Sequence, residues 1–395
     1  MNQRQIAFDI LYKTISDESY SNLLMRKQLN KLEPMQRAFV INLVNGVLRK
    51  YELLEYQYRQ QISSNTSLAN RLILDMALFE RFFLKEKDYV VNHEYVELAD
   101  NRYDKSFINA VLRKTDRFQE GDASVSACLP EWIYRLLKAQ YEEERFEKIL
   151  SMYQQIPRIY YRLNKKKCSY DELKHLKIEI INEDSFCSAQ NLLKTAEYDK
   201  GLFYVQDLNS ASLYHHLSLM KDDLLLDVCS APGSKLFNCL DIIPAGQAYA
   251  NDVNGNRVKL IAKMAEKLGY EGIHYLNHDG RELASKLHMQ FDKIMLDAPC
   301  SGLGVIGRKP DLKFHIKPES LDELQVLQKE LLDSMDPLLK EGGTLLYSTC
   351  TLNKKENATQ VARFLKDHPH YQLAEQETLI NSSGDAFYYA TIKKG

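Results

Sequence analysis

The feature that most constrains the fold is a regular alternation of strand-like and helix-like segments from Asp222 to the end of the chain. Short apolar segments with the character of buried strands lie at residues 224–228, 247–252, 273–277, 293–296 and 344–348. Amphipathic segments at residues 257–268, 321–339 and 355–365 predict helices, and residues 386–393 predict a final strand. This alternation is typical of a mostly parallel sheet covered on both faces, so we expect a doubly wound α/β domain.

The region before this domain has a different pattern. Residues 1 to about 117 predict helices only, because apolar side chains recur at helical spacing and no alternating strand pattern intervenes. Residues 119–130 are rich in small side chains and end in proline, as linkers do. Short strands at 158–163 and 178–181, with a helix at 171–175 between them, predict a small α/β subdomain.

We therefore expect three parts. An all-α domain would span residues 1–130, a linker with the small α/β subdomain residues 131–212, and the doubly wound domain residues 213–395. A chain of 395 residues is too long for one ordinary domain, and its 45% hydrophobic residues suffice for several cores.

Charge and cysteine content exclude several classes of protein. The chain has 52 Lys and Arg against 54 Asp and Glu, which is not the charge of a protein that binds nucleic acid through bulk attraction. Its seven cysteines form no C-x-x-C pair, so we expect free thiols, with neither a disulfide framework nor a metal site. Without a signal peptide or an uncharged apolar run, we expect a cytoplasmic, monomeric protein that does not contact a membrane.

Chemically active residues follow the ends of the predicted strands. In open α/β sheets, ligands bind outside the carboxyl ends of the strands, so residues at these positions converge on one edge. Four acids and two cysteines are predicted to gather there. They come from the segments 227–235, 252, 278–281, 297–304 and 349–351, which contain Asp227, Asp252, Asp279, Asp297, Cys300 and Cys350.

Each of these residues also has a purely structural interpretation. Asp227 alone is explained equally well as a cap of the next helix, and Asp279 as a residue that holds a turn with Gly280. The small turn 231–234 is by itself weak evidence for a nucleotide site. Asp252 is better placed, because an acid at the end of the second strand typically receives two ribose hydroxyls.

The combination indicates a nucleoside without phosphates. The first turn is neither G-x-G-x-x-G nor a Walker sequence, which argues against dinucleotides and nucleoside triphosphates. Acids on successive strands suit S-adenosylmethionine, because they accept hydrogen bonds from its ribose, its amino group and its adenine amine.

Several motifs resemble one known family. The segments 227–235, 297–304 and 348–350 resemble the motifs of the RsmB/Sun family of bacterial rRNA cytosine-C5 methyltransferases, and the run Asp-Ala-Pro-Cys-Ser-Gly at 297–302 is highly specific. The resemblance covers essentially the whole chain. It includes the ending 384–390, the segments 37–50 and 107–114 of a NusB-like helical domain, and the stretch 204–207 before the first turn.

The resemblance implies a NusB-like domain that binds RNA, a Rossmann-like methyltransferase domain that uses S-adenosylmethionine, and a target cytosine in 16S (small-subunit) rRNA. It implies that Cys350 is the nucleophile, that Cys300 assists release of the product, and that Lys235 and Asp297 also touch the target base. The residues implied to contact the cofactor are Cys229, Ser230, Ala231, Pro232, Gly233, Ser234, Lys235, Asp252, Asp279 and Asp297.

This sequence departs from the family pattern at three positions. Ser234 and Leu236 stand where the family usually has glycine and threonine, and Thr351 replaces a usual serine. A side chain at Ser234 could narrow the approach of the backbone to the cofactor, which leaves the affinity open.

The chemistry requires a thiol, because cytosine C5 is too weak a nucleophile to take a methyl group unaided. Addition of a thiolate to C6 makes C5 an enamine carbon, and an unpaired loop presents its base more easily than a duplex does. Local basic clusters such as Arg49–Lys50 and Arg113–Lys114 are predicted to dock the RNA.

Two other functions remain as alternatives. One is a DNA cytosine methyltransferase with Cys300 as its nucleophile, which the second cysteine and the helical domain disfavour. The other is a non-catalytic RNA-binding ribosome-assembly factor, which the presence of both cysteines and all four acids disfavours.

Overall fold

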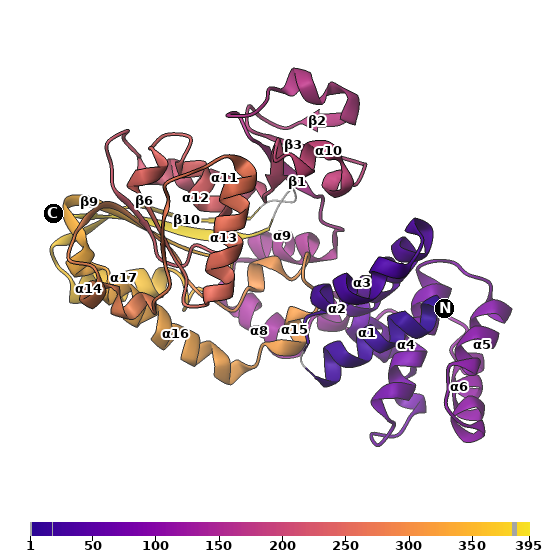
Figure 1. Ribbon diagram of the computed structural model, residues 1–395. Coiled ribbons are helices and arrows are strands. Elements are labelled where there is room, and N and C mark those ends of the chain that lie inside the picture. The colour runs from indigo at the N-terminus through magenta and orange to yellow at the C-terminus, as the bar shows by residue number, and fades with distance from the viewer. Residues whose placement is uncertain (1, 18, 381–384) are drawn as a thin grey trace. The chain divides into compact units, whose positions relative to one another are not determined.

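The computed structural model describes residues 2–17, 19–380 and 385–395, which form two compact units (Figure 1). One unit comprises Met1–Gln154 and Ile306–Lys317, and the other comprises Gln155–Val305 and Pro318–Gly395. These divisions differ from the predicted limits at 130 and 212, which stay a prediction. Gly384, the first residue of the family-like ending, lies outside the described residues.

The first unit is helical throughout its described residues, in agreement with the sequence pattern. Polar side chains begin its helices: Asn2, Ser67 and Asn101 accept hydrogen bonds from backbone amides in the first turns of three of them. Its helices are α1 (Gln3–Ser16), α2 (Ser21–Gln28), α3 (Pro34–Tyr58), α4 (Leu68–Phe82), α5 (Asp88–Glu97), α6 (Arg102–Lys114), α7 (Ala123–Ser126), α8 (Glu131–Gln140), α9 (Glu143–Gln154) and α15 (Leu312–His315).

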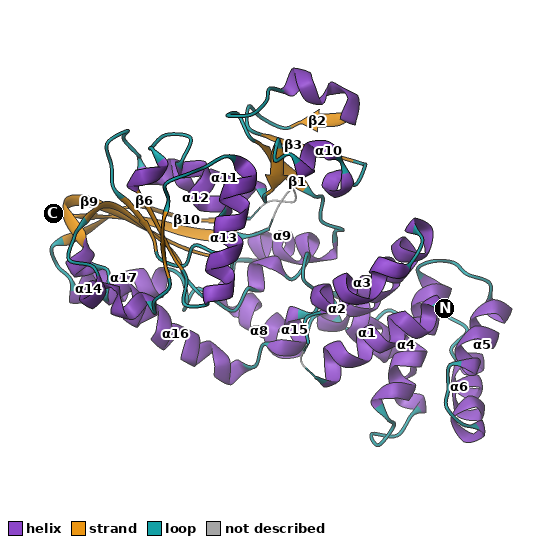
Figure 2. Cartoon of the chain, viewed as in Figure 1, coloured by secondary structure: helices purple, strands orange, loops and turns teal. Residues whose placement is uncertain are grey.

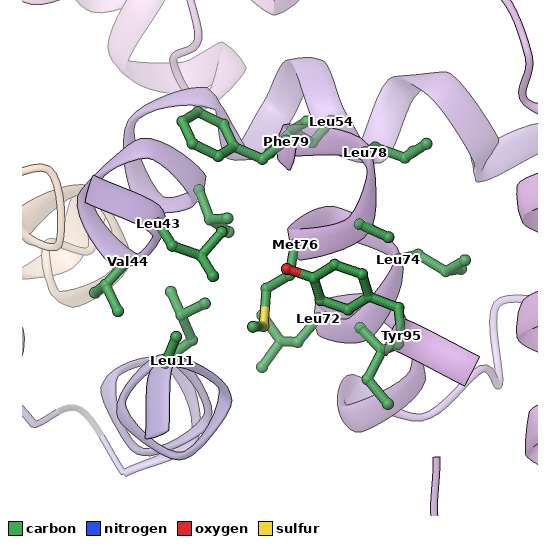
Figure 3. Packing of buried hydrophobic residues seen from close by; sticks show 14 of the residues in the cluster. Leu11, Leu43, Val44, Leu54, Leu72, Leu74, Met76, Leu78, Phe79 and Tyr95 are labelled. Carbon is green, nitrogen blue, oxygen red and sulfur yellow. The ribbon is translucent and has the colours of Figure 1, made fainter. Parts of the chain in front are cut away.

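A single apolar core joins α1, α3, α4, α5 and α6. Figure 3 shows Leu11, Leu43, Met76 and Tyr95 from four different helices pointing into the same interior. Helices α3 and α4 approach closely at Gly46, where an added Cβ would lie 2.0 Å from Cζ of Phe79.

The segment 306–317 packs in this helical unit although it follows the strands of the other unit in the chain. The Asp311 carboxylate accepts hydrogen bonds from the backbone amide and the hydroxyl of Ser21, each at 2.9 Å. The Lys313 ammonium is buried, pairs with Glu52, and donates to the carbonyl of Cys128 at 3.0 Å. A buried ammonium with such partners fixes the segment firmly, which local sequence patterns do not reveal.

The same contacts change the interpretation of one predicted RNA-docking cluster. Arg49 donates to the carbonyl of Gly307 at 3.0 Å, and Lys50 bonds to the side chain of Gln154, so both serve internal contacts. Arg113 and Lys114 are exposed on α6. Of the two predicted clusters, the second therefore presents its charges to solvent.

The second unit begins with a four-stranded antiparallel sheet in the order β2-β3-β1-β4. Two of its strands match the predicted segments, and the predicted helix is a 3-10 helix, η3 (Tyr170–Leu176). The strands are β1 (Tyr160–Leu163), β2 (Ile178–Ile180), β3 (Ser185–Ser188) and β4 (Phe203–Val205).

The main element of this unit is a seven-stranded sheet in the order β10-β11-β9-β8-β5-β6-β7. Strands β9, β8, β5, β6 and β7 pair in parallel, and β10 and β11 add antiparallel pairs, so the predicted mostly parallel sheet is confirmed. The strands are β5 (Leu225–Asp227), β6 (Ala248–Asn251), β7 (His274–Leu276), β8 (Phe291–Asp297), β9 (Leu339–Thr349), β10 (Tyr371–Leu379) and β11 (Phe387–Lys394).

Helices cover both faces of this sheet (Figure 2). One apolar core contains side chains of α12 and α13, and the other contains side chains of α14, α16 and α17. The helices of the unit are α10 (Ala196–Asp199), α11 (Leu208–Ser212), α12 (Ser234–Cys239), α13 (Gly255–Leu268), α14 (Leu283–Lys286), α16 (Pro318–Asp333) and α17 (Ala358–Asp367).

Two details of the sequence prediction are wrong. The helix predicted over 321–339 ends at Asp333, because Pro337 cannot continue it and β9 begins at Leu339. Strand β10 was not predicted, since most of its side chains are exposed and polar at the edge of the sheet. Among the described helices, none has the length and apolarity needed to cross a bilayer.

Candidate active site

The turn after β5 contains a glycine in a backbone conformation that other residues rarely adopt. Gly233 has a φ of +99°, and a Cβ there would lie 2.8 Å from Cζ of Phe237. Helix α12 begins at the next residue, Ser234, in ordinary helical geometry. The sharp change of direction is thus made at Gly233, and Ser234 is left with a role that any helix-forming residue can fill.

Asp227, the last residue of β5, is the most unusual group in the unit. It is 1% exposed, and within the described chain neither of its carboxylate oxygens makes a hydrogen bond of good geometry; the nearby Ser230 hydroxyl gives it only a weak one. The N-cap of α12 is Gly233, so the interpretation of Asp227 as a helix cap is wrong. Burial raises the pKa of Asp227 to about 7. A buried acid with so little hydrogen bonding at a strand end is a candidate for binding a donor group of a ligand.

A cavity of about 260 Å³ opens beside the ends of β5, β6 and β7. It contains three of the predicted cofactor residues, Cys229, Asp252 and Asp279, and its volume and mixed lining suit a nucleoside. Ser230–Lys235 and Asp297 do not line it. The lining residues are Val228, Cys229, Asn251, Asp252, Val253, Arg257, Asp279, Gly280, Arg281, Pro299, Leu327 and Leu331.

Asp252 follows β6 and is 2% exposed. One carboxylate oxygen accepts from the backbone amide of Asn254 at 3.0 Å, and the other lies 3.4 Å from the guanidinium of Arg257. Asn254 is the N-cap of α13 and accepts from two backbone amides. Because Asn254 performs the capping, Asp252 is left facing the cavity.

Asp279 is held by Arg281. Its carboxylate accepts from the backbone amide of Arg281 at 3.0 Å and from the guanidinium at 2.7 Å, and these hydrogen bonds lower the pKa of Asp279. Asp279 therefore does hold a turn, as its structural interpretation predicted, and it also lines the cavity.

The two cysteines at the ends of β8 and β9 lie side by side. The Sγ atoms of Cys300 and Cys350 are 3.4 Å apart, and both side chains are half-buried. The contact with Cys350, burial, and the negative charges of Cys350, Glu356 and Asp297 raise the pKa of Cys300. Two thiols in contact and partly buried in this way hold their protons tightly, so one of the pair can serve as a proton donor while the other reacts.

An ion pair lies close to this thiol pair. The Lys235 ammonium is 2.6 Å from one carboxylate oxygen of Asp297, whose other oxygen accepts from the hydroxyl of Ser348 at 2.9 Å. Burial lowers the pKa of Lys235, but the charges of Asp297 and Cys350 outweigh this effect and raise it. Lys235 thus stays charged at a point where it can stabilise a thiolate.

Comparison with known proteins identifies the family. The model of the 16S rRNA methyltransferase RsmB/F family matches residues 214–392, and the NusB family model matches residues 1–117. The ribosomal RNA small subunit methyltransferase B of Photorhabdus laumondii subsp. laumondii is 32% identical over 95% of this chain and 95% of its own length. The chain belongs to the RsmB/F family. The family prediction made from its motifs is confirmed.

Other relatives of this RsmB/F member agree. A Bacillus subtilis (strain 168) protein, "Probable ribosomal RNA small subunit methyltransferase B", is 32% identical over 93% of this chain and 89% of its own length. The solved structure of PH0851 has a TM-score of 0.82 at 20% identity and covers 100% of this chain and 99% of its own. NSun6 from Pyrococcus horikoshii with SFG has a TM-score of 0.61 at 18% identity and covers 67% of this chain and 98% of its own. At these identities the two structures show a shared fold.

The structure adds residues of this RsmB/F site that the sequence analysis missed. Asn251 ties three strand ends together, donating to the carbonyls of Val228 at 2.9 Å and His278 at 3.0 Å. Arg257 donates to the carbonyl of Ala231 at 2.9 Å and so joins the turn to the cavity. An Asn before Asp252 and a basic residue in the helix that follows are signals that the sequence did contain.

Proposed function

We propose that this RsmB/F protein transfers a methyl group from S-adenosylmethionine to the C5 carbon of a cytosine in 16S rRNA. The observation that carries the proposal is the thiol pair Cys300–Cys350, with a 3.4 Å separation, next to the Lys235–Asp297 ion pair. The relatives above are named as ribosomal RNA small subunit methyltransferases, which supports an rRNA substrate. The exposed pair Arg113–Lys114 is a candidate docking point for that RNA.

The residues around the cavity fit the proposed cofactor. Bound S-adenosylmethionine would supply an electrophilic methyl group on a sulfonium. Asp252 and Asp279, which line the cavity, would accept the ribose hydroxyls and the adenine amine, and Asp227, which is buried at the end of β5 outside that lining, would accept the amino group. The turn from Cys229 to Lys235 would supply the remaining contacts.

The proposed reaction uses Cys350 as the nucleophile. Its thiolate would add to C6 of the cytosine, forming an S–C6 bond and moving the C5=C6 electron pair onto C5. C5 would then take the methyl group, with the S–CH₃ bond breaking and the sulfonium sulfur leaving as a neutral thioether. A base then removes the C5 proton; the electrons of the C5–H bond re-form the double bond and expel the thiolate. Lys235 stabilises the thiolate and, with Asp297, contacts the base. Cys300 assists release of the product.

Methyl transfer to unmethylated small-subunit rRNA tests the proposal. With S-adenosylmethionine labelled in its methyl group, label should appear as 5-methylcytosine in the rRNA, and Cys350→Ala should transfer none. A DNA duplex of the same sequence should remain unlabelled.

Two results would contradict the proposal. Labelling of DNA that depends on Cys300 would assign the protein to the DNA-modifying class. Tight rRNA binding with no labelling would favour a non-catalytic assembly factor. We also propose that the protein works as a monomer in the cytoplasm.

A further inference from the structure

A buried carboxylate lies directly behind the two cysteines. Glu356, in the loop before α17, is fully buried. One of its oxygens accepts from the backbone amide of Ser301 at 2.9 Å and from Gln328 at 3.1 Å. The other accepts from the hydroxyl of Ser301 at 2.6 Å and from Asn353 at 3.1 Å. These donors are all neutral, so the burial of this carboxyl group has a cost that no cation offsets and that needs a reason.

Apart from Gln328 on α16, the donors to Glu356 come from the two loops that carry the cysteines. Ser301 directly follows Cys300, and Thr351 directly follows Cys350. The hydroxyls of Ser301 and Thr351 are 2.7 Å apart, and that of Thr351 lies 3.5 Å from Glu356. One carboxylate thus joins the two loops through the residues that follow the cysteines.

We propose that Glu356 is the positioning residue that holds Cys300 and Cys350 at the spacing at which both reach the same base. This inference rests on the proposed function, and it makes Glu356 responsible for the distance between the two thiols that this function uses. Loops after neighbouring strands are free to separate, and the backbone bond from Gly304 to the carbonyl of Cys350, at 2.9 Å, is a second link between them. Glu356, which lies in the segment that follows Cys350, adds two links to Ser301, from its backbone amide and its hydroxyl.

The charge of Glu356 has a second effect on the same pair. It contributes to the field that, after the Cys350 contact and burial, raises the pKa of Cys300. Removing this charge should therefore make Cys300 easier to ionise as well as looser. A merely structural residue would not change the pH dependence of Cys300 in this way.

An amide cannot replace this carboxylate without loss. Both oxygens of Glu356 accept from an N–H group, so the NH₂ of an amide faces a donor in either orientation. Glu356→Gln therefore keeps the size of the side chain but breaks the link on one side. Gln360→Leu is a matched control, because Gln360 is equally buried one turn further on and bonds to the carbonyl of Gln325 at 3.1 Å, remote from the cysteine loops.

Dithiol capture by phenylarsine oxide measures the spacing without any methylation. The trivalent arsenic bridges two thiols only when they lie close together, so the wild type should take up one equivalent that Cys350→Ala does not. In Glu356→Gln the affinity for the arsenical should fall at least about tenfold, while Gln360→Leu should match the wild type.

Methylation kinetics give an independent result. In Glu356→Gln, kcat should fall by about 10²-fold, the loss that small misplacement of reacting groups causes, with KM for rRNA and the affinity for S-adenosylmethionine unchanged. In a protein that also carries Cys350→Ala, so that Cys300 is the thiol that reacts, Glu356→Gln should lower the pH at which Cys300 reacts with iodoacetamide. Glu356→Asp, which keeps the charge, should restore that pH more than it restores kcat.

Wild-type arsenical capture together with wild-type kcat in Glu356→Gln would overturn the inference. If arsenical capture falls but no protein, wild type included, methylates rRNA, the positioning role stands and the proposed function fails. If Glu356→Gln does not fold, the double variant Ser301→Ala/Thr351→Val removes the hydroxyl link alone, and unchanged capture there overturns the inference.

Discussion

Replacing Asp227 by Asn should stabilise the free protein at alkaline pH. Burial raises the pKa of Asp227 from its ordinary 3.8 to about 7. An acid with a raised pKa in the folded state contributes stability that is fully present below its unfolded pKa and is lost as the pH rises through about 7. At about 1.4 kcal/mol for each tenfold change in proton affinity, ionised Asp227 costs the folded state about 4 kcal/mol at pH 8.

The amide removes this cost because it is neutral at every pH and has the shape of the protonated acid. Urea denaturation without ligand should show Asp227→Asn to be at least about 2 kcal/mol more stable than the wild type near pH 8. The gain should shrink with falling pH and disappear near pH 4. A variant that is less stable than the wild type near pH 8 would refute the reasoning, because it would mean that the carboxylate is satisfied in the folded protein.

Cofactor affinity should change in the opposite direction. If Asp227 accepts the amino group of S-adenosylmethionine, losing that charged hydrogen bond should weaken binding about tenfold or more, although the variant is more stable. In the wild type, binding should release a proton near pH 6.5 and tighten as the pH rises through about 7. Calorimetry in buffers of different ionisation enthalpy measures this release, and its presence in Asp227→Asn would assign it to another group.

Three further predictions concern other residues. In Cys300→Ala, elimination should stall, so a protein–RNA adduct should survive denaturing electrophoresis; Cys350→Ala and the double variant should form none, and an adduct with Cys350→Ala alone would reverse the two roles. Asp252→Ala should weaken S-adenosylmethionine binding by at least about tenfold, and wild-type affinity in calorimetry would return Asp252 to a structural role. Burial raises the pKa of Asp336, but hydrogen bonds from His370 and Lys394 outweigh this and hold it at about 2. Asp336→Asn should therefore lose about 1–2 kcal/mol at neutral pH, a difference that fades as the pH falls from about 4 through 2, and a loss independent of pH in urea denaturation would contradict this.

The position of the site at one edge of the sheet could be predicted from the sequence, because a general rule places ligands at the carboxyl ends of parallel strands. Parallel strands connected by helices present their carboxyl ends together, so residues that follow β5, β6, β8 and β9 must converge. Cys300 and Cys350 thus come into contact, as do Asp297 and Ser348, although each pair is far apart in the chain. The order of the strands does not determine the distances between side chains at that edge. The 3.4 Å contact of the thiols depends on loop geometry.

Other parts lay beyond sequence patterns for identifiable reasons. Glu356 looks like one more charge in a polar stretch, Lys354-Lys355-Glu356-Asn357, and nothing local distinguishes it from its exposed neighbours. Lys313 is hidden in the same way, since its partner Glu52 is distant in sequence. Buried charges are satisfied by long-range contacts, so periodicity and propensity carry no record of them.

Two departures of this chain from its family, Ser234 and Leu236, have a structural explanation. The family glycine is replaced at Ser234, but the left-handed turn that needs glycine is made by Gly233, with a φ of +99°. The family threonine is replaced by Leu236, which is fully buried in the core beneath α12. A site losing its function has no reason to keep Asp227 buried with so little hydrogen bonding or Glu356 buried among neutral donors, since each costs stability. The two substitutions therefore look like repacking around a working site, and the non-catalytic alternative has to explain those costs without a ligand to offset them.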